Sequence, residues 1–264
     1  MIGKFMSNII VAHSDNNVIG KNGKIPWSKE IKKIDQQFFK IFTTGDICIM
    51  GRKTFETFKK PLPNRIMFIL SKKGIDKNEL NSDFKKALKD GTLKLFSSFS
   101  EITNDVEKNT EKYWDAGVRA LWCIGGGELY RFFSHQVEVD ITIRTRIDTI
   151  IAQGDAKYLS LEESSRMGYY NNLMTDTGTG MYIFNQRGPE QPFFAIIIEE
   201  RVSEETFEKL VDSMKWVNYG GKRRVNGIKA SVKTGFDNQE LKESFIADKI
   251  AQADALYASF DEIL

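Results

Sequence analysis

Two glycine-containing turns each follow an apolar, strand-like run and come before a helix-like run. Gly51 ends the run over residues 46–50, and three consecutive glycines, 125–127, follow the run over residues 120–124. A glycine at such a position lets the backbone approach a phosphate, and the first N–H groups of the following helix point toward it. A glycine run alone is more often a tight turn without a ligand, but two such turns together indicate a dinucleotide site.

Cations beside the first of these turns indicate which dinucleotide would bind. Arg52 and Lys53 follow the glycine directly, and Thr54 adds a hydroxyl. Ser71 and Lys72, at the end of the next strand-like run, add a second hydroxyl and a third charge. Each cation alone is typical of a solvated surface. Together they suit the additional ribose phosphate of NADPH, because an NAD site uses an acidic residue for the ribose hydroxyl.

The helix that follows Pro26 and Trp27 carries the carboxylates that could hold a basic heterocycle. A buried carboxylate accepts two parallel hydrogen bonds from an amide-like heterocycle edge with an adjacent amino group. The candidates are Glu30 and Asp35. Asp35 lies among apolar residues that recur at helical spacing over residues 29–42, whereas an exposed acid in a lysine-rich helix is the alternative for Glu30. We therefore favour Asp35.

Strand-like runs alternate with helical patterns along the first part of the chain. This order predicts an α/β fold: a mainly parallel twisted sheet flanked by helices, with an antiparallel edge hairpin at its C-terminal end. A mobile loop is expected over residues 18–24, and a hairpin turn over 175–180. The expected strands are 8–13, 46–50, 65–71, 92–96, 120–124 and 139–147, and the expected helices are 29–42, 52–58, 100–115 and 128–133.

The composition changes after residues 187–192, and we place a domain boundary near Gly188. This gives one domain over residues 1–188 and a small α+β appendage over 189–264. The appendage is expected to hold a strand over 193–199, a helix from Ser203, a basic turn-rich stretch over 219–234, and a second amphipathic helix from Leu241. We expect that deletion of residues 188–264 leaves the chemistry of the first domain intact.

The bulk properties are those of an ordinary globular protein. The chain has 264 residues, 41% hydrophobic residues and a formal net charge of +2, which gives no general case for nucleic-acid or membrane binding. No apolar run is long enough to span a membrane, and no signal peptide is visible. Cys48 and Cys123 lie in apolar runs and are expected to be buried thiols, and the two histidines give little support for a metal site. The expected location is the cytoplasm.

Taken in order, these motifs resemble dihydrofolate reductase over roughly residues 8–187. The resemblance implies NADPH-dependent reduction of 7,8-dihydrofolate, with hydride transfer to carbon 6 and protonation at nitrogen 5. Counting back from Gly51 places the family's acid at Asp35, and Phe39 then occupies a ring-packing position. Thr145 matches the threonine that hydrogen-bonds the acid, and Trp27 matches a residue that orders a water near it.

The resemblance also implies roles for the surrounding residues. Arg65 matches the arginine that clamps the α-carboxylate of the substrate's glutamate tail, and residues 154–155 match a loop that supports the segment 18–26. The implied catalytic residues are Asp35, Trp27 and Thr145; the implied substrate-binding residues are Ala12, Ile25, Asp35, Phe39, Arg65 and Ile124. The implied cofactor-binding residues are Ala12, Ile19, Gly20, Gly51, Arg52, Lys53, Thr54, Ser71, Lys72, Gly125, Gly126, Gly127, Glu128 and Leu129.

Three features depart from the family's pattern. Gln36 follows the acid where an apolar residue commonly contacts the benzoyl ring, so the affinity for folates and inhibitors is expected to differ. The segment 28–34 is lengthened, which changes the entrance of the pocket. Glu128 stands where some members place an arginine toward the cofactor phosphate, so that contact is not available.

Two other functions remain open at this point. The pyrimidine reductase of riboflavin synthesis shares the fold and the glycine turn, but it would not require Pro26, Trp27, Asp35 and Arg65 together. A reductase fold retained as a scaffold is the second alternative, with the appendage as a surface for a homo-oligomer or a protein partner. The basic residues over 215–233 could bind single-stranded nucleic acid, but we favour a solvated turn because the net charge is small.

Overall fold

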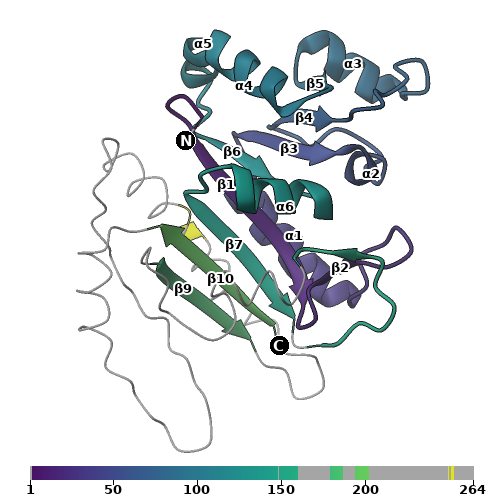
Figure 1. The fold of residues 1–264 in the computed structure, drawn as a ribbon, viewed down its shortest axis with the longest axis vertical. Helices are drawn as coiled ribbons and strands as arrows, with labels where there is room; N and C mark the ends of the chain where they lie inside the picture. Colours follow the sequence, from purple (N-terminus) through teal and green to yellow (C-terminus); the bar gives the residue numbers. More distant parts are fainter. Residues whose placement is uncertain are drawn as a thin grey trace, which may run out of the picture.

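The fold is built on one large twisted sheet. The computed structural model describes residues 2–147, 149–159, 179–186, 194–201, 249, 251 and 252. Within these residues the sheet has eight strands in the order β5-β4-β3-β6-β1-β7-β10-β9 (Figure 1). Its strands are β1 (Met6–Ser14), β3 (Ile47–Gly51), β4 (Ile66–Leu70), β5 (Leu93–Phe96), β6 (Ala120–Cys123), β7 (Ile141–Ile147), β9 (Thr179–Gln186) and β10 (Phe194–Arg201).

The pairing confirms the expected α/β architecture. The strands from β5 to β7 pair in parallel, and β10 pairs antiparallel with both β7 and β9. A short two-stranded sheet joins β2 (Val18–Gly20) to β8 (Ala156–Lys157). The helices are α1 (Lys29–Thr43), α2 (Arg52–Phe55), α3 (Ser82–Asp90), α4 (Phe99–Lys108), α5 (Thr110–Asp115) and α6 (Gly127–Gln136).

Apolar side chains cover both faces of the sheet, because successive residues of a strand point to opposite faces. On β1, Met6 and Ile10 pack in the cluster that includes the buried residues of α1 and α3. Ile9 and Val11 pack in the cluster under α4, α5 and α6. Cys48 and Cys123 are buried free thiols in opposite clusters, as the sequence predicts.

Helix α1 forms where the apolar periodicity predicts it. The Ser28 side chain caps its N-terminus by accepting a hydrogen bond from the Ile31 N–H at 3.3 Å. Ile31 and Phe38 are about one per cent exposed and face the sheet. The same face carries Asp35, so the packing of the apolar residues brings this carboxyl group to the sheet surface.

Several elements differ from the expectation. The predicted helix over 100–115 is two helices, α4 and α5, which meet at Asn109 with φ −112° and ψ 19°. The stretch 18–24 is not all loop, because β2 occupies its first residues. Helix α3 and strand β8 were not predicted. Helix α3 buries only Phe84 and Ala87, so its apolar pattern is weak.

The boundary near Gly188 does not separate the sheet. Strand β10, which we assigned to the appendage, lies between β7 and β9. Of the expected hairpin turn, Thr179 and Gly180 belong to β9, and residues 175–178 lie outside the described residues. The helix from Ser203 and the basic stretch 219–234 also lie outside them, whereas residues 249, 251 and 252 are helical, as predicted. No helix in the described part of the chain is both long and apolar enough to cross a membrane.

The position of β10 reverses our expectation for the deletion of residues 188–264. A chain that ends at residue 187 lacks β10, and the edges of β7 and β9 lose their backbone partners. We expect such a chain to lose cooperative unfolding in urea, because two strands lose their backbone partners and the whole stability of a domain is only about 5–15 kcal/mol. A matched chain that ends at residue 201 should unfold cooperatively. An unchanged unfolding midpoint for the shorter chain would contradict the pairing.

Candidate active site

A buried acid–hydroxyl pair joins α1 to β7. The Thr145 hydroxyl donates to Asp35 Oδ1 at 2.7 Å. Thr145 stands opposite Ala12 in the β1–β7 register, and both lie on the α1 side of the sheet. Burial raises the pKa of Asp35 from 3.8 to about 6, and the hydrogen bond from Thr145 limits the rise by favouring the ionised form. The carboxyl group therefore titrates close to neutral pH.

Trp27 presents an indole N–H to the interior. Its side chain is 6% exposed and packs in the same cluster as Ile31 and Phe38. The Nε1 atom is buried and has no hydrogen-bond partner among the residues that the structure describes. A buried polar group of this kind is usually satisfied by a water or a ligand.

Arg65, just before β4, is hydrogen-bonded to the C-terminal end of α1. Its Nε donates to Thr43 Oγ1 at 3.0 Å, its Nη2 to Thr44 Oγ1 at 3.1 Å, and its Nη1 to the Pro63 carbonyl at 3.0 Å. The guanidinium lies 5.6 Å from the centre of the Phe39 ring. Because arginine has five N–H groups, one on each terminal nitrogen remains for a ligand, in a fork that fits a carboxylate.

The two glycine turns contact each other. Strands β3 and β6 are neighbours, and the Gly51 N–H donates to the Gly125 carbonyl at 2.7 Å. The Gly125–Gly126 peptide bond is cis. A Cβ atom on Gly126 would lie 3.3 Å from Thr54 Oγ1, so a side chain there would crowd the cradle between the turns. Gly51 caps α2 and Gly126 caps α6, which makes the two N-termini a fitting place for a pyrophosphate.

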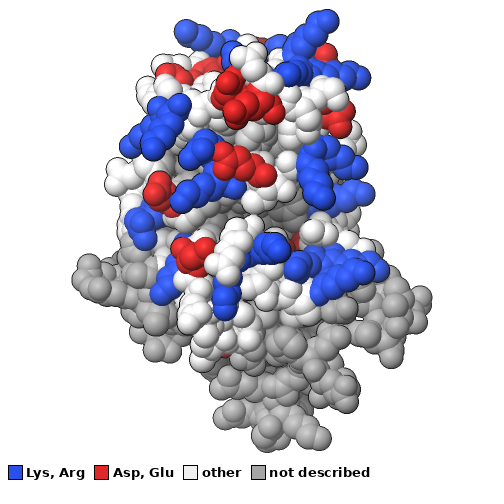
Figure 2. Space-filling model, turned by 90° about the vertical axis from the view of Figure 1, so that its right-hand side faces the viewer, with Lys and Arg blue, Asp and Glu red and all other residues white. Residues whose placement is uncertain are grey.

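The predicted cations are exposed beside this cradle. Lys53 and Lys72 are exposed, and Arg52 is also exposed and pairs with Glu56 at 3.0 Å. Figure 2 shows Lys and Arg side chains spread widely over the face of the molecule turned toward α2 and β2. Ser71 differs, because it is buried and its hydroxyl donates to the Gly74 carbonyl at 2.9 Å.

The segment after β2 is held by the loop that follows β7. The Asp155 N–H donates to the Gly20 carbonyl at 3.2 Å, and Asp155 Oδ2 accepts from the Asn22 N–H at 2.9 Å. These contacts match the support that the sequence predicts for the segment 18–26. Ile25 is 43% exposed at the end of this segment.

Four predicted site residues divide between the two faces of the sheet. Ala12 and Ile124 pack in the cluster on the Asp35 side of the sheet. Ile19 packs in the opposite cluster, under α4–α6. Leu129 has a buried side chain in that opposite cluster, and its N–H donates to the Gly126 carbonyl at 2.9 Å. Neither Ile19 nor Leu129 therefore offers a side chain to the Asp35 side.

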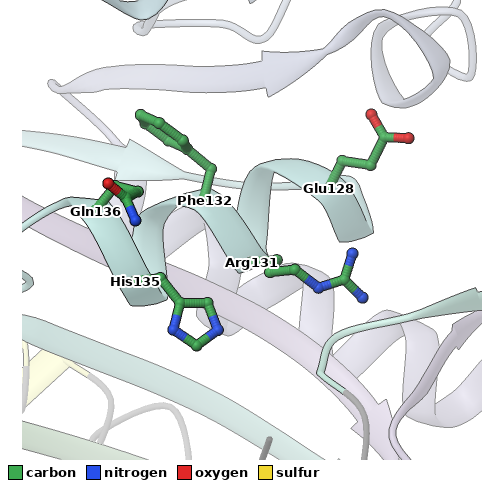
Figure 3. Close-up of a pocket in the computed structure, with 5 residues that line it drawn as sticks. All are labelled: Glu128, Arg131, Phe132, His135 and Gln136. Atoms are coloured by element: carbon green, nitrogen blue, oxygen red, sulfur yellow. The ribbon is translucent and has the colours of Figure 1, made fainter.

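Glu128 is exposed and lines a shallow pocket on the outer face of α6. Its other lining residues are Arg131, Phe132, His135 and Gln136, which all come from the same helix (Figure 3). The Glu128 carboxylate points away from Arg131 in this view. None of the predicted substrate-binding residues lines this pocket, which is distinct from the site around Asp35.

Tyr130, in the cluster under α4–α6, supports the second glycine turn, a contact that sequence reasoning missed. Its hydroxyl donates to the Ile10 carbonyl at 2.8 Å, and a Cβ on Gly125 would lie 3.3 Å from its ring. Burial raises its pKa well above the ordinary value. The signal in the sequence is its spacing, because a residue one helical turn after a glycine cap directs its side chain back toward that turn.

Comparison with known proteins agrees with this geometry. A family model for dihydrofolate reductase matches residues 6–169. A bifunctional dihydrofolate reductase-thymidylate synthase from Paramecium tetraurelia is 45% identical over 218 residues, which cover 79% of this chain and 40% of that protein. A dihydrofolate reductase from Haemophilus influenzae is 35% identical over 124 residues, 47% of this chain and 62% of that protein. The chain thus spans less than two thirds of the length of these relatives.

The same fold occurs in a solved structure. Dihydrofolate reductase from Enterococcus faecalis, complexed with NADP(H) and RAB-propyl, has a TM-score of 0.52 and 21% sequence identity. The likeness covers 75% of this chain and 97% of that one. This likeness shows the fold, and the family model that matches residues 6–169, more than half of the chain, shows that the chain belongs to the dihydrofolate reductase family.

Proposed function

We propose that the protein reduces 7,8-dihydrofolate to 5,6,7,8-tetrahydrofolate with NADPH. The observation that carries the proposal is the buried Asp35 carboxyl group, held by Thr145 at 2.7 Å, on the side of the sheet that Ala12 and Ile124 share. Family membership supports the reaction class. In the overall reaction, dihydrofolate gains a hydride at carbon 6 and a proton at nitrogen 5, and NADPH leaves as NADP⁺.

Asp35 orients the ring and controls the proton. Its carboxylate accepts parallel hydrogen bonds from the ring amide and the adjacent amino group, which fixes the pterin in one orientation. The negative charge also raises the proton affinity of nitrogen 5 before hydride transfer. The buried Trp27 N–H can hold the water that delivers the proton.

The glycine turns and the cations fit the cofactor. NADPH supplies the hydride when it is bound. The N-termini of α2 and α6 would hold its pyrophosphate, and the exposed cations Arg52, Lys53 and Lys72 would neutralise its ribose phosphate. The Enterococcus faecalis relative that shares the fold was solved in complex with NADP(H), which supports this choice.

Helix α1 spaces the two ends of the substrate. Asp35 and Thr43 are eight residues apart on this helix, which corresponds to a rise of about 12 Å. Thr43 holds Arg65, so a ligand whose ring contacts Asp35 meets the guanidinium fork further along the same helix. An elongated substrate with a heterocycle at one end and a carboxylate at the other fits this spacing.

The direct test follows the absorbance of NADPH with and without dihydrofolate. Wild type should oxidise NADPH only when dihydrofolate is present, and Asp35→Asn should lower kcat/KM by about 100-fold or more, the usual contribution of a general acid–base group. Asp115→Asn, an exposed change on α5, is the matched control and should retain activity. An active Asp35→Asn enzyme would contradict the assigned role. Failure of wild type with dihydrofolate, but turnover with a ribosylated aminopyrimidine, would favour the riboflavin-type reaction.

The pKa of Asp35 also predicts a pH-dependent stability. Folding raises this pKa from 3.8 to about 6, so protonation of Asp35 stabilises the fold fully at low pH, and this contribution is lost as the pH rises through 6. Asp35→Asn cannot ionise, and its amide oxygen can still accept from Thr145. We expect urea unfolding to show similar stability for both proteins near pH 3, below the unfolded pKa, and a more stable variant, by on the order of 3 kcal/mol, at pH 7.5. Equal stabilities at both pH values would contradict the burial of this charge.

Lys53 tests the choice of cofactor. Lys53→Glu places a negative charge beside the proposed ribose phosphate and should raise the KM for NADPH by about tenfold, the equivalent of roughly 1.4 kcal/mol. The KM for NADH, which lacks this phosphate, should change much less. Lys112→Glu, an exposed change on α5, controls for the altered net charge. Equal effects on both cofactors would place the phosphate elsewhere.

A further inference from the structure

A lysine near the end of the chain caps the C-terminus of α1. Lys249 Nζ donates to the Ile41 carbonyl at 2.7 Å and lies 3.4 Å from the Thr44 carbonyl oxygen. The last carbonyls of a helix lack partners within the helix, and a cation there also interacts favourably with the helix dipole. This contact joins residues 208 positions apart in the sequence.

The last turn of α1, which Lys249 caps, also binds Arg65. Thr43 and Thr44 accept hydrogen bonds from the guanidinium, and their hydroxyls donate in turn to the Phe39 and Lys40 carbonyls, each at 2.6 Å. Thr44 therefore connects the two cations directly. Its carbonyl faces Lys249, and its hydroxyl accepts from Arg65.

The chain just beyond this turn is fixed to the sheet. The Gly45 N–H donates to the Asn64 carbonyl at 2.8 Å. Asp46, only 2% exposed, accepts from the backbone N–H groups of Arg119 and Ala120 and from Trp122 Nε1. Lys249 thus contacts the last turn of α1. On one side of this turn α1 packs on the sheet, and on the other side residues 45–46 are hydrogen-bonded to the sheet.

We propose that Lys249 is a positioning residue for the carboxylate of the substrate's glutamate tail. By capping α1 it fixes the Thr44 backbone, and through the Thr44 hydroxyl it holds the guanidinium fork of Arg65 in its binding orientation. This inference rests on the proposed function, because it needs a ligand with a carboxylate at this end of α1. Lys249 lies outside residues 6–169, so the cap is supplied by a part of the chain beyond the family match.

The test compares ligands with and without the tail. Lys249→Met keeps the apolar stem of the side chain and removes its charge and N–H donors. Binding of folate and of pterin-6-carboxylate, which lacks the aminobenzoyl-glutamate tail, is measured by quenching of tryptophan fluorescence in the full chain. Steady-state kinetics with dihydrofolate and a tail-less dihydropterin are measured in parallel.

We expect Lys249→Met to weaken folate binding and to raise the KM for dihydrofolate by about 3- to 10-fold, the range for the loss of one ordinary hydrogen bond, because Lys249 acts on the ligand only through Thr44 and Arg65. The kcat, and the binding of the tail-less ligand, should not change. Lys249→Arg should restore folate binding, because a guanidinium also donates to carbonyls. Lys108→Met, at the end of α4 on the other face of the sheet, should behave as wild type.

Two results would overturn the inference. In one, Lys249→Met weakens the binding of folate and of pterin-6-carboxylate equally, or weakens the binding of neither. In the other, wild type binds folate no more tightly than the tail-less ligand, which would mean that Arg65 does not clamp a tail. Turnover of the tail-less dihydropterin in that case would still support the proposed reductase activity, so failure of the inference is distinguishable from failure of the function.

Discussion

The hydrogen bond between Thr145 and Asp35 is the interaction on which the site depends. Removing a carboxyl group from water is costly, and the observed partner is a single hydroxyl at 2.7 Å. The raised pKa of Asp35 expresses that cost. The carboxyl group stays at the sheet because Ile31 and Phe38, on the same face of α1, are buried there. Apolar packing of one helix thus holds a carboxyl group out of water, beside its hydroxyl partner.

The parallel sheet assembles the remaining groups around this acid. Parallel strands carry their following turns to the same edge, so the turns after β3 and β6 meet through the Gly51–Gly125 hydrogen bond. Helix α1 crosses the same side of the sheet, with Asp35 in its middle and the threonines that orient Arg65 at its end. The loop around Asp155 is hydrogen-bonded to Gly20 and Asn22 and so fixes the segment after β2. In the proposed function, different elements of one framework would therefore recognise the heterocycle, the dinucleotide and the carboxylate tail.

Much of this framework could be predicted from the sequence, because its signals are local. The apolar spacing around Asp35 predicted α1, and the glycines after two apolar runs predicted the turns. Contacts between distant segments gave no such signal. The pairing of β10 with β7, the Lys249 cap and the Tyr130–Ile10 hydrogen bond each join positions far apart in the chain. The break at Asn109 was missed because the apolar pattern continues across it, and the packing of Ile19 in the cluster under α4–α6 is a further contact that no local pattern indicates.

The most direct measurement is the titration of the Asp35 carboxyl group by carbon-13 NMR. Protein labelled at the aspartate carboxyl carbons would be compared with labelled Asp35→Asn, whose missing signal assigns the resonance. The account predicts a midpoint near pH 6, because the carboxyl group is buried and accepts one hydroxyl hydrogen bond. A midpoint near the ordinary value of 3.8 would contradict it, because a carboxyl group with that pKa would be solvated rather than buried at the sheet.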